Sequence, residues 1–368
     1  MKAKTFLFSA FCLYLPIKII VVVLLINILP DVFGRTYFAY MDPLTNSLKA
    51  GDTAVYVTCN LRSPNGLFSG LLCVMDIKRI DTLLPILLSF ALNSIKDIGF
   101  IYLASQIVSR KPLIIFVLLM ALHPYMGLYH ARLDTMVFAC LAVLLLYIRI
   151  LQNQKIALHW DIIFILLTGF RNGAAIMFIA FYLYEIFRNV RSRSLSSQAS
   201  WIKPMLIALV SLVAVFTVSQ IPEENYAISF WESSKNYPLN MTYFLSFVET
   251  PVTILNYIIS GLLIFISHLL LLLGFREGAF THFGTYFFPF DLEAQFAVFI
   301  GTILVILHGF GFYNFFKHYL KIDMRHLCYF ALVVPSFLLV AHMRYLLPLM
   351  PLALLGVVIY IDRTLAQD

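Results

Sequence analysis

Two aspartates near the first hydrophobic segment are candidates for acid-base chemistry. Asp52 follows Gly51, which permits a turn, and lies four residues before Tyr56, so a helix would place Asp52 and Tyr56 on one face. Asp52 could accept a proton from an attacking hydroxyl, or bind a divalent cation (Mg²⁺ or Mn²⁺) that steadies a phosphate leaving group. Asp31 competes for the same role. The alternative for Asp52 is a solvated loop aspartate that caps a helix N-terminus.

A short run that begins at His123 gathers polar side chains between two hydrophobic segments. Tyr129, His130, Arg132 and Asp134 fall within six residues. The guanidinium of Arg132 suits phosphate recognition, because it is always charged and presents a fork of donors. Asp134 could orient Arg132 or bind an acceptor molecule. The alternative is a charge pair at a helix start, where Asp134 would interact favourably with the helix dipole.

Arg171 stands alone in a long apolar stretch. A guanidinium at membrane depth costs at least about 2.5–3.5 kcal/mol, so such a residue is expected to have a function. Gly169 and Gly173 flank it and favour a helix break, which is tolerated only where it lines protein or a water-filled cavity. A phosphate or pyrophosphate is the expected partner. A structural pairing with a distant carboxylate such as Asp97 is the alternative.

Two other groups of charged residues have simpler interpretations. Lys96 and Asp97 lie side by side within a hydrophobic segment, which is typical of a neutralised intramembrane ion pair. His342 and Arg344 lie between the last two segments. Arg344 could bind substrate phosphate, or it could anchor the chain at the membrane interface together with Tyr345.

The composition indicates the elements that must position these residues. Of 368 residues, 61% are hydrophobic and 12% are charged, against roughly 25% charged in soluble domains. Apolar stretches of about 20 residues recur along the chain, as in transmembrane helices. The net charge of +7 comes from basic clusters between these stretches, which argues against nucleic-acid binding. The five cysteines contain no CxxC pair, so neither a metal site nor a disulfide framework is expected.

We therefore predict an all-α fold: one integral membrane domain, 1–368, with about 10–12 spans. The candidate spans are 6–29, 82–108, 112–128, 132–150, 159–170, 172–188, 202–220, 251–274, 293–315, 326–342 and 344–361. Basic clusters at cytoplasmic ends place both termini in the cytoplasm, which requires an even number of crossings. The eleven candidates break this parity, and the weak ones are the two short segments that flank Arg171 and the segment 251–274, which could be re-entrant or a split pair. The polar loops then meet on the extracytoplasmic side, and the longest of them, 31–80, follows the first span.

This order of features resembles the type-C integral-membrane glycosyltransferases. The Gly51-Asp52-x-x-x-Tyr56 cluster is similar to the first luminal loop of the glycan-anchor mannosyltransferases, in which the aspartate is the presumed base. The stretch from His123-Pro124 to Asp134-Thr135 is similar to a helix start of that class, and Arg344-Tyr345 with Pro348 is similar to its closing element. The usual acidic pair after the first span is reduced to Asp31-Val32, which leaves the base open between Asp52 and Asp31.

The resemblance implies transfer of a sugar from a polyprenyl-phosphate-linked donor to a glycan or lipid-linked acceptor at the outer face of a bacterial inner membrane. Tyr56, Arg132, Asp134, Arg171, His342 and Arg344 would then bind substrate, and no nucleic acid is involved. The layout is also similar to O-antigen and exopolysaccharide polymerases, which are the first alternative. A polysaccharide or lipid transporter is the second, although no paired halves are visible.

Overall fold

The part of the chain that the structure describes is entirely helical. The computed structural model describes residues 2–27, 71, 74–75, 83–131, 136–152, 162–163, 165–167, 170, 173–191, 292–332 and 347–367, and no strand occurs among them. This confirms the all-helical class. In these ranges one helix, Ile86–Ser105, is long and apolar enough to cross a membrane, and Phe8–Leu24 and Met136–Leu151 are shorter apolar helices.

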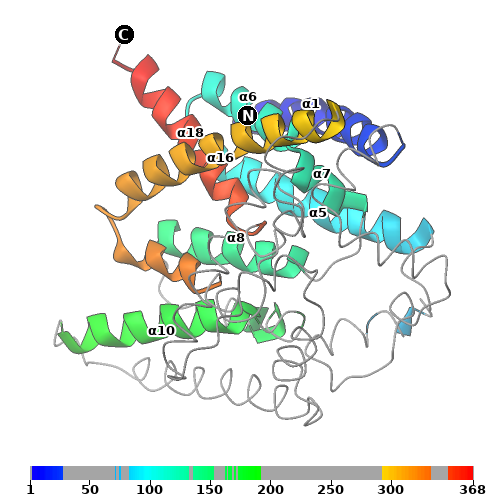
Figure 1. Cartoon of the computed structure of the whole chain (residues 1–368). Helices are drawn as coiled ribbons and strands as arrows, with labels where there is room; N and C mark the ends of the chain where they lie inside the picture. Colours follow the sequence, from blue (N-terminus) through cyan, green and yellow to red (C-terminus); the bar gives the residue numbers. More distant parts are fainter. Residues whose placement is uncertain are drawn as a thin grey trace, which may run out of the picture.

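The described helices pack on one another as shown in Figure 1. Helix α1 packs on α6 and α7, and helix α5 packs on α6, α7 and α8. Helix α18 packs on both α6 and α16. The 3₁₀ helix η2 packs on α10. Their bounds are α1 Lys2–Asn27, α5 Leu83–Ser105, α6 Arg110–Leu122, α7 Pro124–Ala131, α8 Met136–Gln152, α10 Gly173–Arg191, α16 Leu292–Tyr319, η2 Met324–Leu332 and α18 Met350–Leu365.

The predicted span 112–128 is wrong, because the chain forms two helices there, α6 and α7, which meet at His123. The backbone of His123 is extended, with φ −62° and ψ 117°. Pro124 explains this break, since its ring disfavours the helical conformation of the preceding residue. The chain continues as α7, with Pro124 in the first position of the helix. A proline is tolerated there because the backbone N–H that it lacks would have no acceptor within the helix. The predicted single span is therefore two helices, and their junction at His123 and Pro124 is here called the corner.

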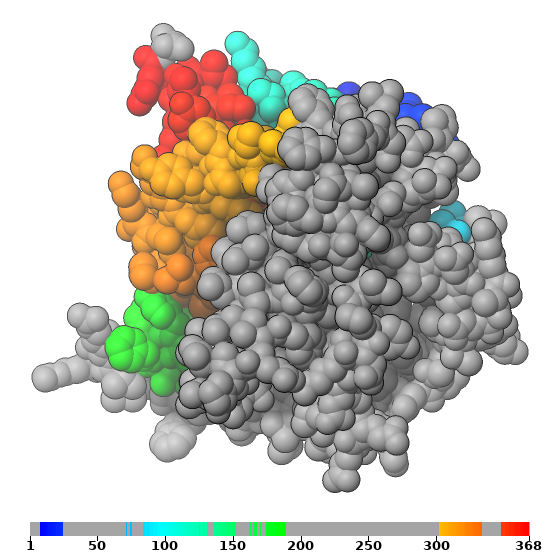
Figure 2. Space-filling model, viewed as in Figure 1, coloured from blue at the N-terminus to red at the C-terminus, as the bar shows by residue number. Residues whose placement is uncertain are grey.

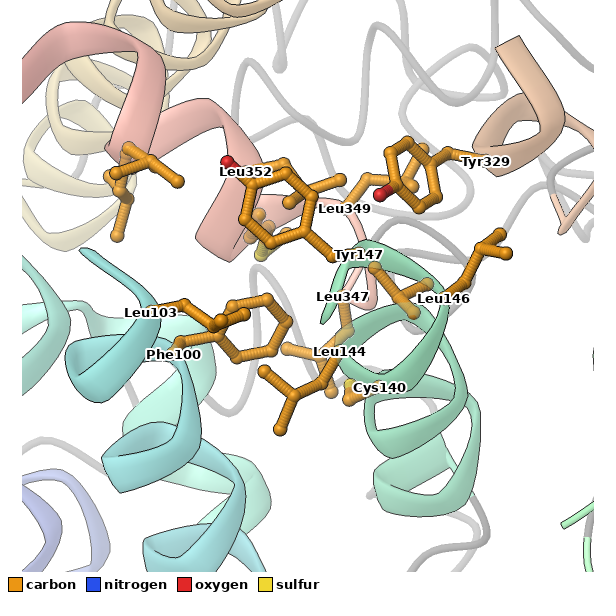
Figure 3. Packing of buried hydrophobic residues seen from close by; sticks show 14 of the residues in the cluster. Phe100, Leu103, Cys140, Leu144, Leu146, Tyr147, Tyr329, Leu347, Leu349 and Leu352 are labelled. Atoms are coloured by element: carbon orange, nitrogen blue, oxygen red, sulfur yellow. The ribbon is translucent and has the colours of Figure 1, made fainter. Parts of the chain in front are cut away.

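A buried apolar core joins α5, α8, η2 and α18 (Figure 3). Phe100 and Leu103 of α5 lie against the α8 side chains, and Tyr147 of α8 lies between them and α18. Phe100 and Tyr147 are completely buried. Large buried aromatic side chains of this kind carry much of the packing energy of a core.

Ion pairs connect η2 to α10 at the end of α16. Arg325 Nη1 lies 3.1 Å from Glu185 Oε1, and Arg325 Nε donates to Asp323 Oδ2 at 2.7 Å. Burial disfavours the ionised Asp323, but its hydrogen bonds with Arg325 outweigh this and hold the Asp323 pKa below its usual value. The network therefore connects the turn after α16 to α10.

Helices α16 and α18 approach each other closely through two glycines. A Cβ on Gly311 would collide with the carbonyl oxygen of Ala353, and a Cβ on Gly356 would collide with the carbonyl oxygen of Gly311. Small residues allow this backbone approach, as in many membrane helix pairs. Figure 2 shows α16 at the surface beside α18. Four large apolar side chains of α16 are exposed: Ile303, Ile306, Phe310 and Tyr313.

We predict that Gly311→Ala and Gly356→Ala each destabilise the protein by about 1–3 kcal/mol or more, because the opposing atoms belong to backbone that cannot rotate away. Gly309→Ala is the matched control. A Cβ at Gly309 meets nothing within 4 Å, and alanine favours helix by about 1 kcal/mol. Thermal unfolding of the purified protein in detergent measures the difference. Equal melting temperatures for all three variants would contradict the close approach.

Candidate functional site

The residues that the sequence pointed to as a site lie outside the described part of the chain. Neither their positions nor their contacts can be compared with the predictions, which stay predictions. They are Asp31, Asp52, Tyr56, Arg132, Asp134, Arg171, His342 and Arg344. The site that the structure does describe is a group of buried polar side chains on α1, α5 and α7.

Five completely buried side chains make up this group, here named the Asp97 cluster. Its members are Tyr14, Lys18, Lys96, Asp97 and His130, and none exposes any side-chain surface. Tyr14 and Lys18 come from α1, Lys96 and Asp97 from the middle of α5, and His130 from α7. Ionisable groups buried in an apolar bundle are costly and commonly mark a functional site.

The spacing of polar residues along α1 and α5 explains why they face each other. Tyr14 and Lys18 are four residues apart, so they lie on one face of α1. On α5, Ser89, Asn93 and Lys96 follow the same helical spacing of four and three residues. All of these side chains are buried against neighbouring helices.

Asp97 is the centre of the cluster. Its Oδ1 lies 3.0 Å from Lys96 Nζ, which confirms the predicted pairing of these two residues. Tyr14 Oη lies 2.5 Å from Asp97 Oδ2, and His130 Nε2 lies 3.4 Å from the same oxygen. One carboxylate therefore links α1, α5 and α7.

The two lysines use further acceptors. Lys96 Nζ donates to Asn93 Oδ1 at 3.1 Å. Lys18 Nζ donates to the carbonyl oxygens of Met120 at 2.8 Å and Ala121 at 3.4 Å. These carbonyls belong to the last turn of α6, where carbonyl groups have no N–H partner within the helix. Lys18 therefore also caps the C-terminus of α6.

Side chains from outside α7 hold both of its ends. Ser89 Oγ and Asn93 Nδ2 donate to the carbonyl oxygen of Tyr129 at 3.1 and 3.0 Å, near the C-terminus of α7. At its N-terminus the backbone N–H of Met126 donates to His123 Nδ1 at 3.3 Å. These bonds satisfy groups that a short helix leaves unpaired. A helix of eight residues is thereby held firmly at the corner.

A histidine pair connects this corner to α16. His123 Nε2 and His308 Nε2 are 2.9 Å apart, and both rings are buried. Since His123 Nδ1 accepts from Met126, a neutral His123 carries its hydrogen on Nε2 and donates it to His308. The corner thus contacts helices from both halves of the chain.

The hydrogen-bond partners of Tyr14 and His130 indicate which of their atoms carry hydrogen. His130 Nδ1 lies 2.6 Å from the carbonyl oxygen of Met126, which only accepts, so Nδ1 carries a hydrogen. The single hydroxyl hydrogen of Tyr14 can point to Asp97 or to His130 Nε2, at 3.1 Å, but not to both. Tyr14 donates to Asp97, so His130 Nε2 lies beside the hydroxyl oxygen of Tyr14.

The predicted pair of Lys96 and Asp97 lies within a larger buried cluster. His130 also contacts the Asp97 carboxylate, and Tyr14 donates to it. Lys18 lies one turn from Tyr14 on α1 and donates to α6 instead.

Sequence reasoning missed Lys18 and the role of Tyr14. The signal was present: a lone lysine in the apolar segment 6–29 is the same kind of anomaly as Arg171. His130 was singled out only as part of the polar run, and its buried contact with Asp97 depends on packing between helices far apart in the sequence.

In the described ranges, no group of three or more His, Cys, Asp or Glu side chains could hold a metal ion. The divalent cation proposed for Asp52 lies outside those ranges and stays a prediction. Comparison of the chain with protein-family models, curated proteins and solved structures finds no match.

We predict that Tyr14→Phe destabilises the protein by about 1–3 kcal/mol, because it removes the hydroxyl that both Asp97 and His130 contact. Tyr102→Phe, at an exposed position on α5, is the matched control and should change stability by less than about 0.5 kcal/mol. The melting temperatures of both variants in detergent test this. A Tyr14→Phe protein as stable as the control would show that the cluster does not hold the helices together.

Proposed function

We propose that this protein is a polytopic membrane glycosyltransferase of the type-C kind, with both termini in the cytoplasm of a bacterium and its site at the outer face of the inner membrane. Its donor is a polyprenyl-phosphate-linked sugar, and its acceptor is a surface glycan or a lipid-linked glycan. The proposal draws on the recurrent apolar segments, the acidic first loop and the isolated arginines of the sequence.

The way the Asp97 cluster holds α7 is the structural observation that supports this proposal best. His130 is buried against Tyr14 and Asp97, and the carbonyl of Tyr129 is bound by Ser89 and Asn93. Ala131, the last residue of α7, directly precedes Arg132 in the chain. A substrate-binding residue is most effective on a rigid support, and α7 provides one.

In the proposed reaction, the lipid-linked sugar enters from the bilayer and its phosphate is held by Arg171, assisted by Arg132 or Arg344. Asp52, or in its place Asp31, accepts the proton of the acceptor hydroxyl. The hydroxyl oxygen bonds to the anomeric carbon as the bond from that carbon to the phosphate oxygen breaks. The phosphate leaves with the electron pair, and fixed positive charge stabilises it.

Two other functions remain as alternatives. A repeat-unit polymerase would use the same arginines for a lipid pyrophosphate, with both donor and acceptor linked to lipid. A polysaccharide or lipid transporter is favoured by one observation, the buried chain of ionisable groups around Asp97, because proton relays in transporters are built in this way.

The surface glycan of a deletion strain distinguishes these functions, measured by gel ladder and by the mass of the lipid-linked repeat. A ladder whose repeats each lack one sugar is the expected result for the glycosyltransferase. Collapse of the ladder to a single repeat would identify the polymerase. An unchanged glycan would contradict both enzymes and favour the transporter.

We predict that Asp52→Asn inserts normally but lowers the transfer rate by about 10²–10⁴-fold, because amide oxygen is a poor proton acceptor. Asp42→Asn in the same loop is the control and should retain wild-type transfer. Complementation of the deletion strain measures both, with protein amounts checked in the membrane fraction. If Asp52→Asn restores the glycan fully, the role of base passes to Asp31.

A further inference from the structure

We propose that the start of α6 and the ends of α16 and α18 form a binding surface for the head group of an anionic glycerophospholipid. The inference rests on the membrane location in the proposed function and not on sugar transfer. Its basis is a set of basic side chains that lie far apart in the sequence and that the packing brings together. This set, here named the basic edge, consists of Arg110, Lys111, Lys317, Lys321 and Arg363.

Two contacts between distant segments bring these helix ends together. At the start of α6, the backbone N–H and the Oγ of Ser109 donate to Asp362 Oδ1 of α18 at 3.1 and 2.5 Å. The next residue of α18, Arg363, contacts His318 Nδ1 near the end of α16. Figure 2 shows the start of α6 in cyan, the end of α18 in red and the end of α16 in orange along one side of the molecule.

The basic edge is exposed and positively charged. All five of its side chains are open to solvent, where lysine and arginine carry a positive charge at neutral pH. The guanidinium of Arg363 can only donate, so His318 Nδ1 accepts and the imidazole is neutral. Burial and the neighbouring Arg363 also lower the pKa of His318. The contact with His318 therefore leaves the charge of Arg363 uncompensated.

Carboxylates at the same helix ends are fewer than the cations. In the described ranges they are Asp362 and Asp323. Asp323 accepts from Arg325 Nε at 2.7 Å and is thereby paired with a cation outside the basic edge. Asp362 is thus one carboxylate set against five cations. A surface with this imbalance attracts anions such as the phosphodiester of a lipid head group.

Apolar side chains beside the cations favour a lipid over other anions. Three exposed apolar residues lie one helical turn from a basic residue, toward the middle of the same helix. They are Ile114 four residues from Arg110, Tyr313 four residues from Lys317, and Tyr360 three residues from Arg363. Residues at these spacings share a helix face. Cations next to tyrosines and apolar side chains suit the boundary between head groups and acyl chains, whereas an anion without acyl chains would use the charges alone.

Competition binding to the full-length protein in detergent tests the proposal, with a fluorescent phosphatidylglycerol as the probe. The competitors are unlabelled phosphatidylglycerol, phosphatidylcholine with the same acyl chains, and glycerol 3-phosphate. We expect phosphatidylglycerol to compete at least about tenfold better than phosphatidylcholine. This preference should shrink between about 0.1 and 1 M salt, because the screening length falls from roughly 10 to 3 Å. Equal competition by the two lipids would overturn the proposal.

Lysine variants show whether the basic edge is the site. Lys111→Gln and Lys317→Gln should each weaken phosphatidylglycerol binding about fivefold, and the double variant about 30-fold, because each cation near a lipid surface contributes similarly. Arg188→Gln is the matched control, since it removes an exposed cation from α10, outside the basic edge. It should weaken binding less than about twofold. Equal losses in the three single variants would indicate a general charge effect and overturn the site.

The remaining outcomes separate the ligand, the fold and the proposed function. Glycerol 3-phosphate that competes as well as phosphatidylglycerol would overturn the phospholipid as the ligand. Melting curves without lipid check that each variant is folded, which is expected because the substituted side chains are exposed. An altered glycan in the deletion strain without a preference for phosphatidylglycerol would refute this inference alone. Lysine-dependent lipid binding with an unchanged glycan would refute the proposed glycosyl transfer alone.

Discussion

The contact of Asp97 with Lys96, Tyr14 and His130 is the interaction on which the described N-terminal helices depend. A carboxylate in a low-dielectric interior must be paired, and its partners here come from three helices. The side chains that satisfy it are themselves tied to backbone: Lys96 through Asn93, and His130 through Met126. Because Tyr14, Asp97 and His130 contact one another from three different helices, α1, α5 and α7 can pack in few other ways.

The C-terminal helices are joined by a different kind of contact. Between α16 and α18 the backbones meet at Gly311 and Gly356, and Arg363 of α18 contacts His318 of α16 nearer the helix ends. The contact at the two glycines depends on shape, as in helix pairs that pack through small residues. The histidine pair His123–His308 joins the two regions, so the polar corner and the glycine contact belong to one body.

The chemistry proposed for this protein requires rigid positive charge next to a reactive phosphate. The Asp97 cluster has two features that such chemistry uses: basic side chains fixed by buried contacts and a short helix held at both ends. Lysine Nζ and histidine ring atoms that are fixed before substrate arrives need little reorganisation when charge develops. The same features would also serve a proton relay, which is why the transporter remains an alternative.

The sequence by itself predicted the helical class, since recurrent apolar stretches of about 20 residues are typical of helices, which satisfy their backbone hydrogen bonds internally. It also predicted the pairing of Lys96 with Asp97, because neighbouring opposite charges in an apolar segment must compensate each other. The break within the predicted span 112–128 follows from Pro124, which is a local signal in the sequence. Only the tertiary structure decided that Tyr14 and His130 contact the Asp97 carboxylate. Tyr14 lies 83 positions from Asp97 and 116 positions from His130, and no local pattern of residue types specifies which distant helix faces which.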